Sequence, residues 1–276
     1  MVLYISVAVV CLLITAVAAL VVRRLLDEGH VNRIWRSLQL EPTGEVFREE
    51  MVAGLPAPAR RYLLHSIKPA TPLAKSVRLR MIGGLRPEVD AHWTRMRAEE
   101  ILSVPEGFVW KAAVRRRGKS YRGADYYADG VGRARFWLWG FIPAMRMEGP
   151  DTSKSAVGRL AIESVWLPSC LLPQAGAKWE SINAHSAQVT LRIGDETATL
   201  TLSIDADGRL QRAVISRWGT VTEDGTPAYV PFHLDVEEER EFEGYTIPSN
   251  VATGWWVRPD YYLEFFRATL LEATYL

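Results

Sequence analysis

The chain has 276 residues, of which 48% are hydrophobic, and its formal net charge at pH 7 is +1. Such a balanced charge argues against a nucleic-acid-binding protein, which needs a concentrated basic surface to meet the phosphates. The two cysteines are Cys11 and Cys170, and Cys11 lies in the apolar N-terminus. One thiol in the rest of the chain excludes an internal disulfide framework and a cysteine metal cluster there.

An unbroken apolar run extends from Val2 to Val22 and ends at Arg23-Arg24. Because an α-helix rises about 1.5 Å per residue, about 20 such residues span the hydrocarbon core of a bilayer. We therefore predict a single-pass transmembrane anchor at residues 2–22. A cleaved signal peptide is the alternative, since Ala16-Val17-Ala18 has the form of a cleavage site, but no basic residue precedes the run. The flanking arginines favour a cytoplasmic body.

Residues 25–69 are predicted to form a helical segment that packs on the rest of the protein. Apolar residues recur at spacings of three and four between Val31 and Leu38, which gives an apolar stripe along one helix face. Shorter helical stretches are expected at 45–52 and from Pro56 or Pro58 to Leu64, because proline suits the first turn of a helix.

Residues 73–276 are predicted to form one mainly β (α+β) domain. Apolar and polar residues alternate, for example at 76–81, 187–193 and 198–204, with the period of a half-buried strand. Short turn signals such as Gly194-Asp195 separate these runs, and strands joined by short turns must be antiparallel. The spacing of the turns gives about ten strands. A sheet of this size has to curl to bury its apolar side, so we predict a curved antiparallel half-barrel.

One helix is predicted within this domain, over residues 153–167. It carries apolar residues on opposite sides, such as Leu160 and Ile162, which indicates a helix held against the concave face of the sheet. Arg159 and Glu163 are four residues apart on it. At a surface such a pair contributes a few tenths of a kcal/mol, whereas in a partly buried position it could orient a polar head group.

No motif predicts a metal site or a cofactor. The five histidines are scattered without ligand spacing, and the sequence has no nucleophile elbow and no complete phosphate-binding loop. Glu237, Glu239, Glu241 and Glu243 alternate along one predicted strand and could form an acidic catalytic or cation-binding row. A charged row on a strand more often faces water or opposite charges, and we favour that interpretation.

Tryptophan is the clearest excess, with ten residues in the chain. A large half-barrel needs bulky side chains to fill its interior, and tryptophan often does this. Tryptophan and tyrosine can equally line an apolar pocket for a lipid-like ligand, with a few polar groups for its head. Core filling is the more frequent role of such residues, but a membrane tether would bring hydrophobic molecules within reach, which gives the second interpretation more weight than usual.

Four stretches carry a resemblance to a known family: PARRYL from Pro58, YRGADYYADG from Tyr121, GRLAIESVWLPS from Gly158 and GYTIPS from Gly244. With these, most of the chain after the anchor resembles a family of uncharacterised bacterial proteins with a similar N-terminal anchor. The sheet is similar in style to that of periplasmic lipoprotein carriers, whose half-barrel covers an apolar cavity capped by helices. This resemblance implies that the body lies outside the cytoplasm, whereas the arginines that flank the apolar run favour a cytoplasmic body. Matching positions without a known family role are Asp125, Tyr126, Arg159, Glu163, Trp166 and Pro168.

We therefore predict a membrane-anchored, non-catalytic protein that binds a lipid or other hydrophobic ligand in an aromatic-lined concavity. The predicted ligand-binding residues are Trp110, Trp166 and Trp218 as walls, Arg159 as the head-group contact, and Tyr126 and Glu163. One alternative is an envelope hydrolase with Glu163 as general acid or base beside Asp125 or His185. Another is a partner-docking module with a packed interior and an exposed aromatic patch.

Overall fold

The computed structural model describes residues 2–42, 44–86, 91–116, 118–222, 224–258 and 260–276. The helices are α1 (Val2–Ser37), α2 (Ala57–Ser66) and α3 (Pro150–Glu163), with short 3-10 turns at Glu49–Val52, Ser164–Trp166, Pro168–Leu171 and Pro173–Ala175. The strands are β1 (Val77–Leu85), β2 (Thr94–Ser103), β3 (Gly107–Arg116), β4 (Lys119–Ala128), β5 (Val131–Leu138), β6 (Ile142–Glu148), β7 (Lys178–Asn183), β8 (Ser186–Ile193), β9 (Glu196–Ile204), β10 (Leu210–Gly219), β11 (Ala228–Phe242), β12 (Tyr245–Arg258) and β13 (Tyr261–Tyr275).

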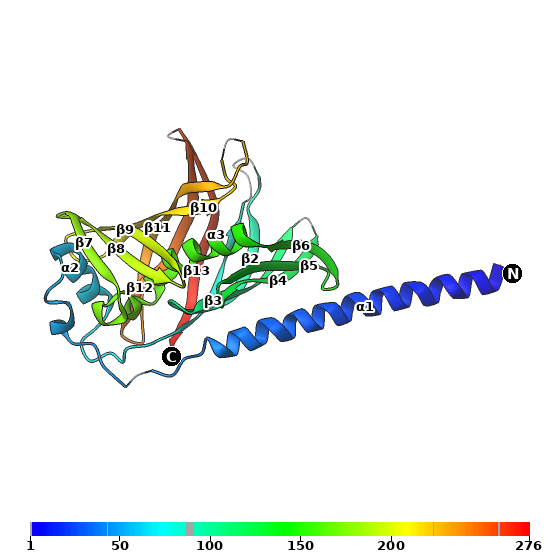
Figure 1. The fold of residues 1–276 in the computed structure, drawn as a ribbon, viewed down its shortest axis with the longest axis horizontal. Coiled ribbons are helices and arrows are strands. Elements are labelled where there is room, and N and C mark those ends of the chain that lie inside the picture. The colour runs from blue at the N-terminus through cyan, green and yellow to red at the C-terminus, as the bar shows by residue number, and fades with distance from the viewer. Residues whose placement is uncertain (1, 43, 87–90, 117, 223, 259) are drawn as a thin grey trace.

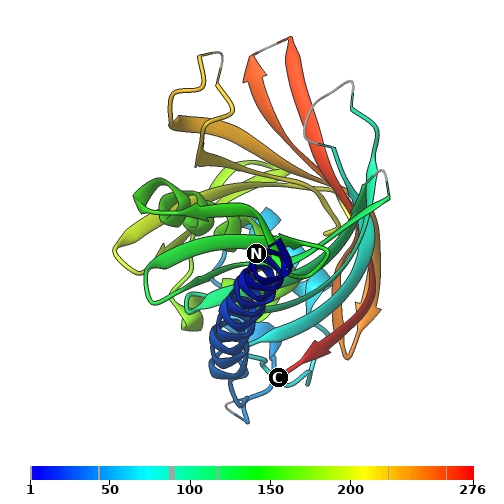
Figure 2. The same cartoon turned by 90° about the vertical axis from the view of Figure 1, so that its right-hand side faces the viewer.

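These strands form one 13-stranded antiparallel sheet in the order β6-β5-β4-β3-β2-β1-β13-β12-β11-β10-β9-β8-β7. Two meanders, β1–β6 and β7–β13, meet where β1 pairs with β13. The sheet curls around a central space without closing (Figures 1 and 2). The predicted curved antiparallel half-barrel is therefore confirmed. The sheet has three strands more than the ten expected. Its edge strands β6 and β7 are exposed along almost their whole length and so lack the alternating pattern that predicts a strand.

Two-residue turns set the register of several hairpins. Asp129-Gly130 joins β4 to β5 and Glu243-Gly244 joins β11 to β12, and both residues of each pair have positive φ. This is the conformation of the turns that match the twist of a hairpin, and glycine adopts it without steric cost. Gly194-Asp195 connects β8 to β9, as its sequence predicts.

The predicted internal helix is confirmed as α3, which connects the two edge strands and lies within the curve of the sheet (Figures 1 and 2). It contacts β4, β5 and β6 on one side and β8, β9 and β10 on the other. Two glycines permit the close approach: a Cβ on Gly132 would lie 2.8 Å from the Cα of Ser153, and one on Gly158 would lie 2.7 Å from the Cγ of Arg217. The α-helix ends at Glu163, and a 3-10 turn continues to Trp166.

The convex face of the sheet carries a smaller apolar cluster beneath the C-terminal half of α1. Val31 and Leu38 pack there on Ile101, Val109 and Tyr126. Because side chains alternate along β2, β3 and β4, each of these strands contributes to this cluster with one face and to the main core with the other. The helix therefore continues past the apolar run and becomes part of the globular body.

The first part of α1 projects away from the sheet (Figure 1). The helix is long and apolar enough to cross a membrane, and its most apolar stretch is exposed. A signal sequence near the N-terminus can meet the same criteria of length and composition, so the helix is compatible with both interpretations.

Candidate functional site

A cavity of about 540 Å³ lies between α3 and the concave face of the sheet. Its walls are mainly apolar and largely aromatic, with Trp110, Phe136, Trp166, Phe232, Phe265 and Phe266 among the lining residues. Met145 and Met147 of the edge strand β6 also line it, and both are exposed to solvent. The cavity falls in the range of about 300–1,000 Å³ that is typical of small-molecule sites, and it opens at the edge of the sheet.

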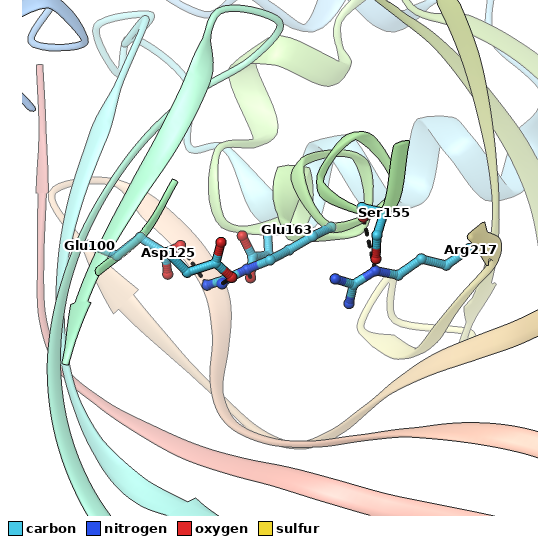
Figure 3. Close-up of polar contacts among 6 residues, drawn as sticks. Glu100, Asp125, Ser155, Glu163 and Arg217 are labelled. Carbon is cyan, nitrogen blue, oxygen red and sulfur yellow. Dashed lines mark hydrogen bonds and ion pairs between the residues drawn. The ribbon is translucent and has the colours of Figure 1, made fainter. Parts of the chain in front are cut away.

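Arg159 of α3 is hydrogen-bonded to three acidic side chains, those of Glu100, Asp125 and Glu163, which Figure 3 labels. Its Nε donates to Glu163 Oε1 at 2.7 Å, its Nη1 to Asp125 Oδ2 at 2.7 Å, and its Nη2 to Glu100 Oε1 at 3.0 Å. The guanidinium also lies 4.4 Å from the centroid of the Phe108 ring. Burial alone would lower the pKa of Arg159, but the three carboxylates outweigh it and raise the pKa. Arg159 is therefore a fully paired cation.

Two of these carboxyl groups are deeply buried and close to each other. Burial raises the pKa of Glu100 well above its usual range, and the charge of neighbouring Glu163 raises it further. Burial also raises the pKa of Glu163, against the opposing effect of Arg159. One oxygen of each group, Oε2, has no hydrogen-bond partner among the described residues. The environment thus favours the protonated form of Glu100, which leaves fewer negative charges to balance the arginines.

A second arginine, Arg217, reaches the cavity from β10 on the opposite wall. Its Nε donates to the backbone oxygen of Ser155 on α3 at 3.0 Å (Figure 3), and its guanidinium lies 4.8 Å from the Phe232 ring and 5.3 Å from the Trp255 ring. No carboxylate of the described residues forms an ion pair with it. Burial, together with the positive charge of Arg159, lowers the pKa of Arg217 to about 10. It therefore remains charged near neutral pH.

Four of the six predicted ligand-binding residues line this cavity: Trp110, Arg159, Glu163 and Trp166. Trp166 is buried, and its Nε1 donates to the backbone oxygen of Pro248 at 3.0 Å, so it forms a fixed wall. The three acidic partners of Arg159 come from β2, β4 and α3, which the sheet brings together although they are distant in sequence. Contact of these residues with a ligand stays a prediction.

The other two predicted residues lie outside the cavity lining. Asp125 points into the cavity, so the pleat of β4 directs Tyr126 to the convex face, where its ring lies 5.7 Å from that of His30 on α1. Trp218 lies beside the start of α3, where its Nε1 donates to Asp151 Oδ1 at 2.8 Å and Lys154 Nζ sits 4.0 Å from its ring. These two contacts of Trp218, with Asp151 and Lys154, hold α3 to the sheet.

Arg217 was not among the predicted site residues, although the sequence carries a signal for it. Ala213 and Ile215 are buried residues on the inner face of β10, and Arg217 continues the same alternation. A cation in register with an apolar inner face is an exception to the usual pattern of burial. Met145 and Met147 had no comparable signal because β6 is an edge strand with an exposed pattern.

The residues proposed for the other chemistries lie apart from the cavity or are already paired. His185 lies in the turn between β7 and β8 and does not line the cavity, whereas Asp125 and Glu163 share Arg159. In the acidic row, Glu239 accepts from His65 at 2.8 Å and Glu241 pairs with the cation Lys68 at 2.7 Å, so both carboxylates have a partner next to the sheet. Within the described parts of the chain, no three His, Cys, Asp or Glu side chains are placed to hold a metal ion.

Comparison with protein families places the chain in one of them. Residues 45–268 match the model of a family of unknown function, DUF6544. The chain belongs to this family. Its DUF6544 region covers α2, α3 and the cavity lining, and the resemblance to uncharacterised proteins is confirmed. No curated protein sequence matches the chain.

Three solved structures are similar to this DUF6544 protein in general architecture. One is a LolA superfamily protein from Nitrosomonas europaea, with 10% identity, a TM-score of 0.42, and coverage of 79% of this chain and 92% of that one. Another is a putative outer membrane lipoprotein-sorting protein domain from Vibrio parahaemolyticus, with 11% identity, a TM-score of 0.38, and coverage of 72% of this chain and 85% of that one. The third is a DUF1329 family protein from Desulfovibrio piger, with 10% identity, a TM-score of 0.39, and coverage of 73% of this chain and 86% of that one.

Proposed function

We propose that this DUF6544 protein is a membrane-anchored, non-catalytic protein that binds a lipid or other hydrophobic ligand in the cavity beneath α3. The supporting observation is the cavity itself, about 540 Å³ of space with aromatic and methionine walls. Because the cavity opens to solvent, its apolar walls would otherwise face water, which is unfavourable. A ligand with an apolar body would fill it and remove that surface from water.

Binding is favoured over hydrolysis by the state of the acidic groups. Among the described residues, the carboxylates that line the cavity are Asp125 and Glu163, and each is bonded to Arg159 at 2.7 Å. A general base needs a lone pair directed at the substrate, whereas one oxygen of each of these carboxylates accepts from the guanidinium of Arg159, which fixes the group against that cation. The arrangement suits a fixed polar support at one side of an apolar chamber.

The proposed anchor is the exposed apolar part of α1. Arg24 follows this run directly and is held to the body, because its Nη1 donates to the backbone oxygen of Gly140 in the β5–β6 turn at 2.7 Å. The body would therefore sit close to the lipid surface, where an opening at β6 has access to lipids.

Photo-crosslinking of the full chain in lipid nanodiscs tests this function. The nanodiscs contain a phospholipid with a diazirine in its acyl chain, and crosslinked peptides are located by mass spectrometry. We expect crosslinks on α3, β6 and β11 in addition to α1. The variant Ala144→Trp adds bulk at the exposed opening and should reduce the cavity crosslinks at least several-fold while leaving those on α1 unchanged.

The matched control is Ser181→Trp, which adds the same side chain at an exposed position of the opposite edge strand, β7. It should leave both sets of crosslinks unchanged. Crosslinks confined to α1 in the wild-type protein would contradict lipid binding in the cavity.

A further inference from the structure

Arg217 is a half-buried cation that forms no ion pair with a carboxylate of the described chain. The charges of Glu163 and Asp125 only partly offset the lowering of its pKa. Arginine is rarely taken out of water without a partner, because a charge loses much of its solvation in an apolar environment. Arg217 retains one hydrogen bond from Nε to Ser155 and the faces of two aromatic rings. Ring contacts of this kind contribute about 0.5–2 kcal/mol, and they do not replace the anion that usually accompanies an arginine that has lost part of its solvation.

The charges that face the cavity are unequal in number. Its lining contains four arginines, Arg86, Arg116, Arg159 and Arg217, against the two carboxylates Asp125 and Glu163. Arg159 is fully paired, Arg86 donates to the backbone oxygen of Glu264, and Arg116 is exposed at the opening. Arg217 is therefore the interior cation whose terminal nitrogens have no bonded acceptor in the described part of the chain.

We propose that Arg217 binds the anionic head group, a carboxylate or a phosphate, of an amphiphile whose apolar tail fills the cavity. This inference rests on the proposed function and narrows the ligand class. A guanidinium presents parallel N–H groups that match two oxygens of either anion, and such charge-assisted pairs are short and strong. The apolar walls around Phe232 would then take the tail. Arg159, which sequence reasoning favours as the head-group contact, serves instead to hold Glu100, Asp125 and Glu163 in place.

Paired photoprobes in nanodiscs test the head group with the full chain. One probe is a diazirine-bearing C18 fatty acid, and the other is the fatty alcohol with the same chain. The measured quantity is the ratio of cavity crosslinks to α1 crosslinks, which corrects for the different partitioning of the two probes into the bilayer. For the wild-type protein we expect a ratio roughly tenfold higher with the acid, since one charge-assisted contact is worth a factor of this order.

Three variants assign the preference to Arg217. Arg217→Gln should abolish the preference for the acid while keeping alcohol crosslinks, and Arg217→Lys should keep only part of the preference, because the positive charge remains but the parallel N–H pair is lost. Arg212→Gln is the matched control, since Arg212 is on the same strand, exposed, and paired with Asp235 outside the cavity. Circular dichroism and melting curves check that each variant is folded. If Arg217→Gln fails to fold, the Lys variant still carries the test, because a head-group contact predicts a reduced acid preference in the folded variant, whereas a purely structural role predicts the wild-type ratio.

Each outcome separates the head-group inference from the proposed function. Equal ratios for acid and alcohol in the wild-type protein would overturn the role of Arg217 and leave hydrophobic binding intact. An absence of cavity crosslinks with both probes would overturn both. Acetate or inorganic phosphate that displaces the acid probe at equal concentration would identify a free-anion site and contradict an amphiphile, whereas no displacement at that concentration supports the proposal.

Discussion

Glu100 and Glu163 are buried carboxyl groups whose pKa values are raised, chiefly by burial. The folded protein therefore holds a proton that the unfolded chain releases near pH 4.5, so stability falls as pH rises from the unfolded pKa through the raised folded pKa. We expect Glu100→Gln, which cannot ionise, to gain stability relative to the wild type between pH 5 and pH 8. The gain is about 1.4 kcal/mol for each pH unit over which the two states differ by one proton.

Melting temperature measured against pH checks this prediction, since about 1 kcal/mol corresponds to a shift of roughly 2–4 °C in a domain of this size. The control is Glu272→Gln, because Glu272 is exposed on the outer face of β13 and pairs with Arg80 there. It should show no such gain as pH rises. A difference between Glu100→Gln and the wild type that stays constant with pH would contradict a raised pKa for Glu100.

At the scale of the element, α3 depends on its close contact with β10 at Gly158. A Cβ there would lie 2.7 Å from Cγ and 3.5 Å from Cα of Arg217, so Gly158→Ala must displace the helix or the arginine. Overpacking costs about 1–3 kcal/mol, while the better helix propensity of alanine returns about 1 kcal/mol. We expect a net loss of up to about 2 kcal/mol in urea unfolding, with fewer lipid crosslinks in the cavity.

Gly29→Ala in α1 is the matched control, because a Cβ there meets only the Nη1 of Arg33 at 3.9 Å. That variant should be as stable as the wild type or slightly more stable. An equal effect of the two substitutions would show that the cost at Gly158 does not come from the contact with Arg217.

The elements themselves were largely predictable, because alternation and turn residues report on local geometry. The pattern at 187–204 gives β8, its turn and β9, and the apolar residues on opposite sides of 153–167 give a helix enclosed by the sheet. Which residues meet inside was less predictable. A shift of one position reverses the face of a strand residue, so Tyr126 was expected where Asp125 lies. Arg159 meets Glu100 only through pairing of strands β2, β3 and β4, which local sequence does not encode.

For the molecule as a whole, the join between α1 and the sheet fixes how the cavity would face a bilayer. Asp27 of α1 pairs with Arg135 of β5 at 2.7 Å, and Arg24 binds the β5–β6 turn at Gly140. Both contacts lie just after the apolar run, so the turn would be at the lipid surface when the run spans the membrane. Figure 1 shows β5 and β6 on the side of the sheet along which α1 departs. The same hairpin carries the opening of the cavity through Met145 and Met147.

Trp139 in this turn is 57% exposed, and tryptophan prefers the interface between lipid and water. We expect a fluorophore on Trp139→Cys to be quenched by lipids with a nitroxide near the head group, in full-length protein that carries Cys11→Ser to leave buried Cys170 as the other thiol. The same fluorophore on Ile182→Cys, an exposed position of the far edge strand β7, should be quenched several-fold less. Equal quenching at the two positions would mean that the body is not oriented by α1. The opening at β6 would then have no privileged access to the bilayer, and ligands would have to reach the cavity through water.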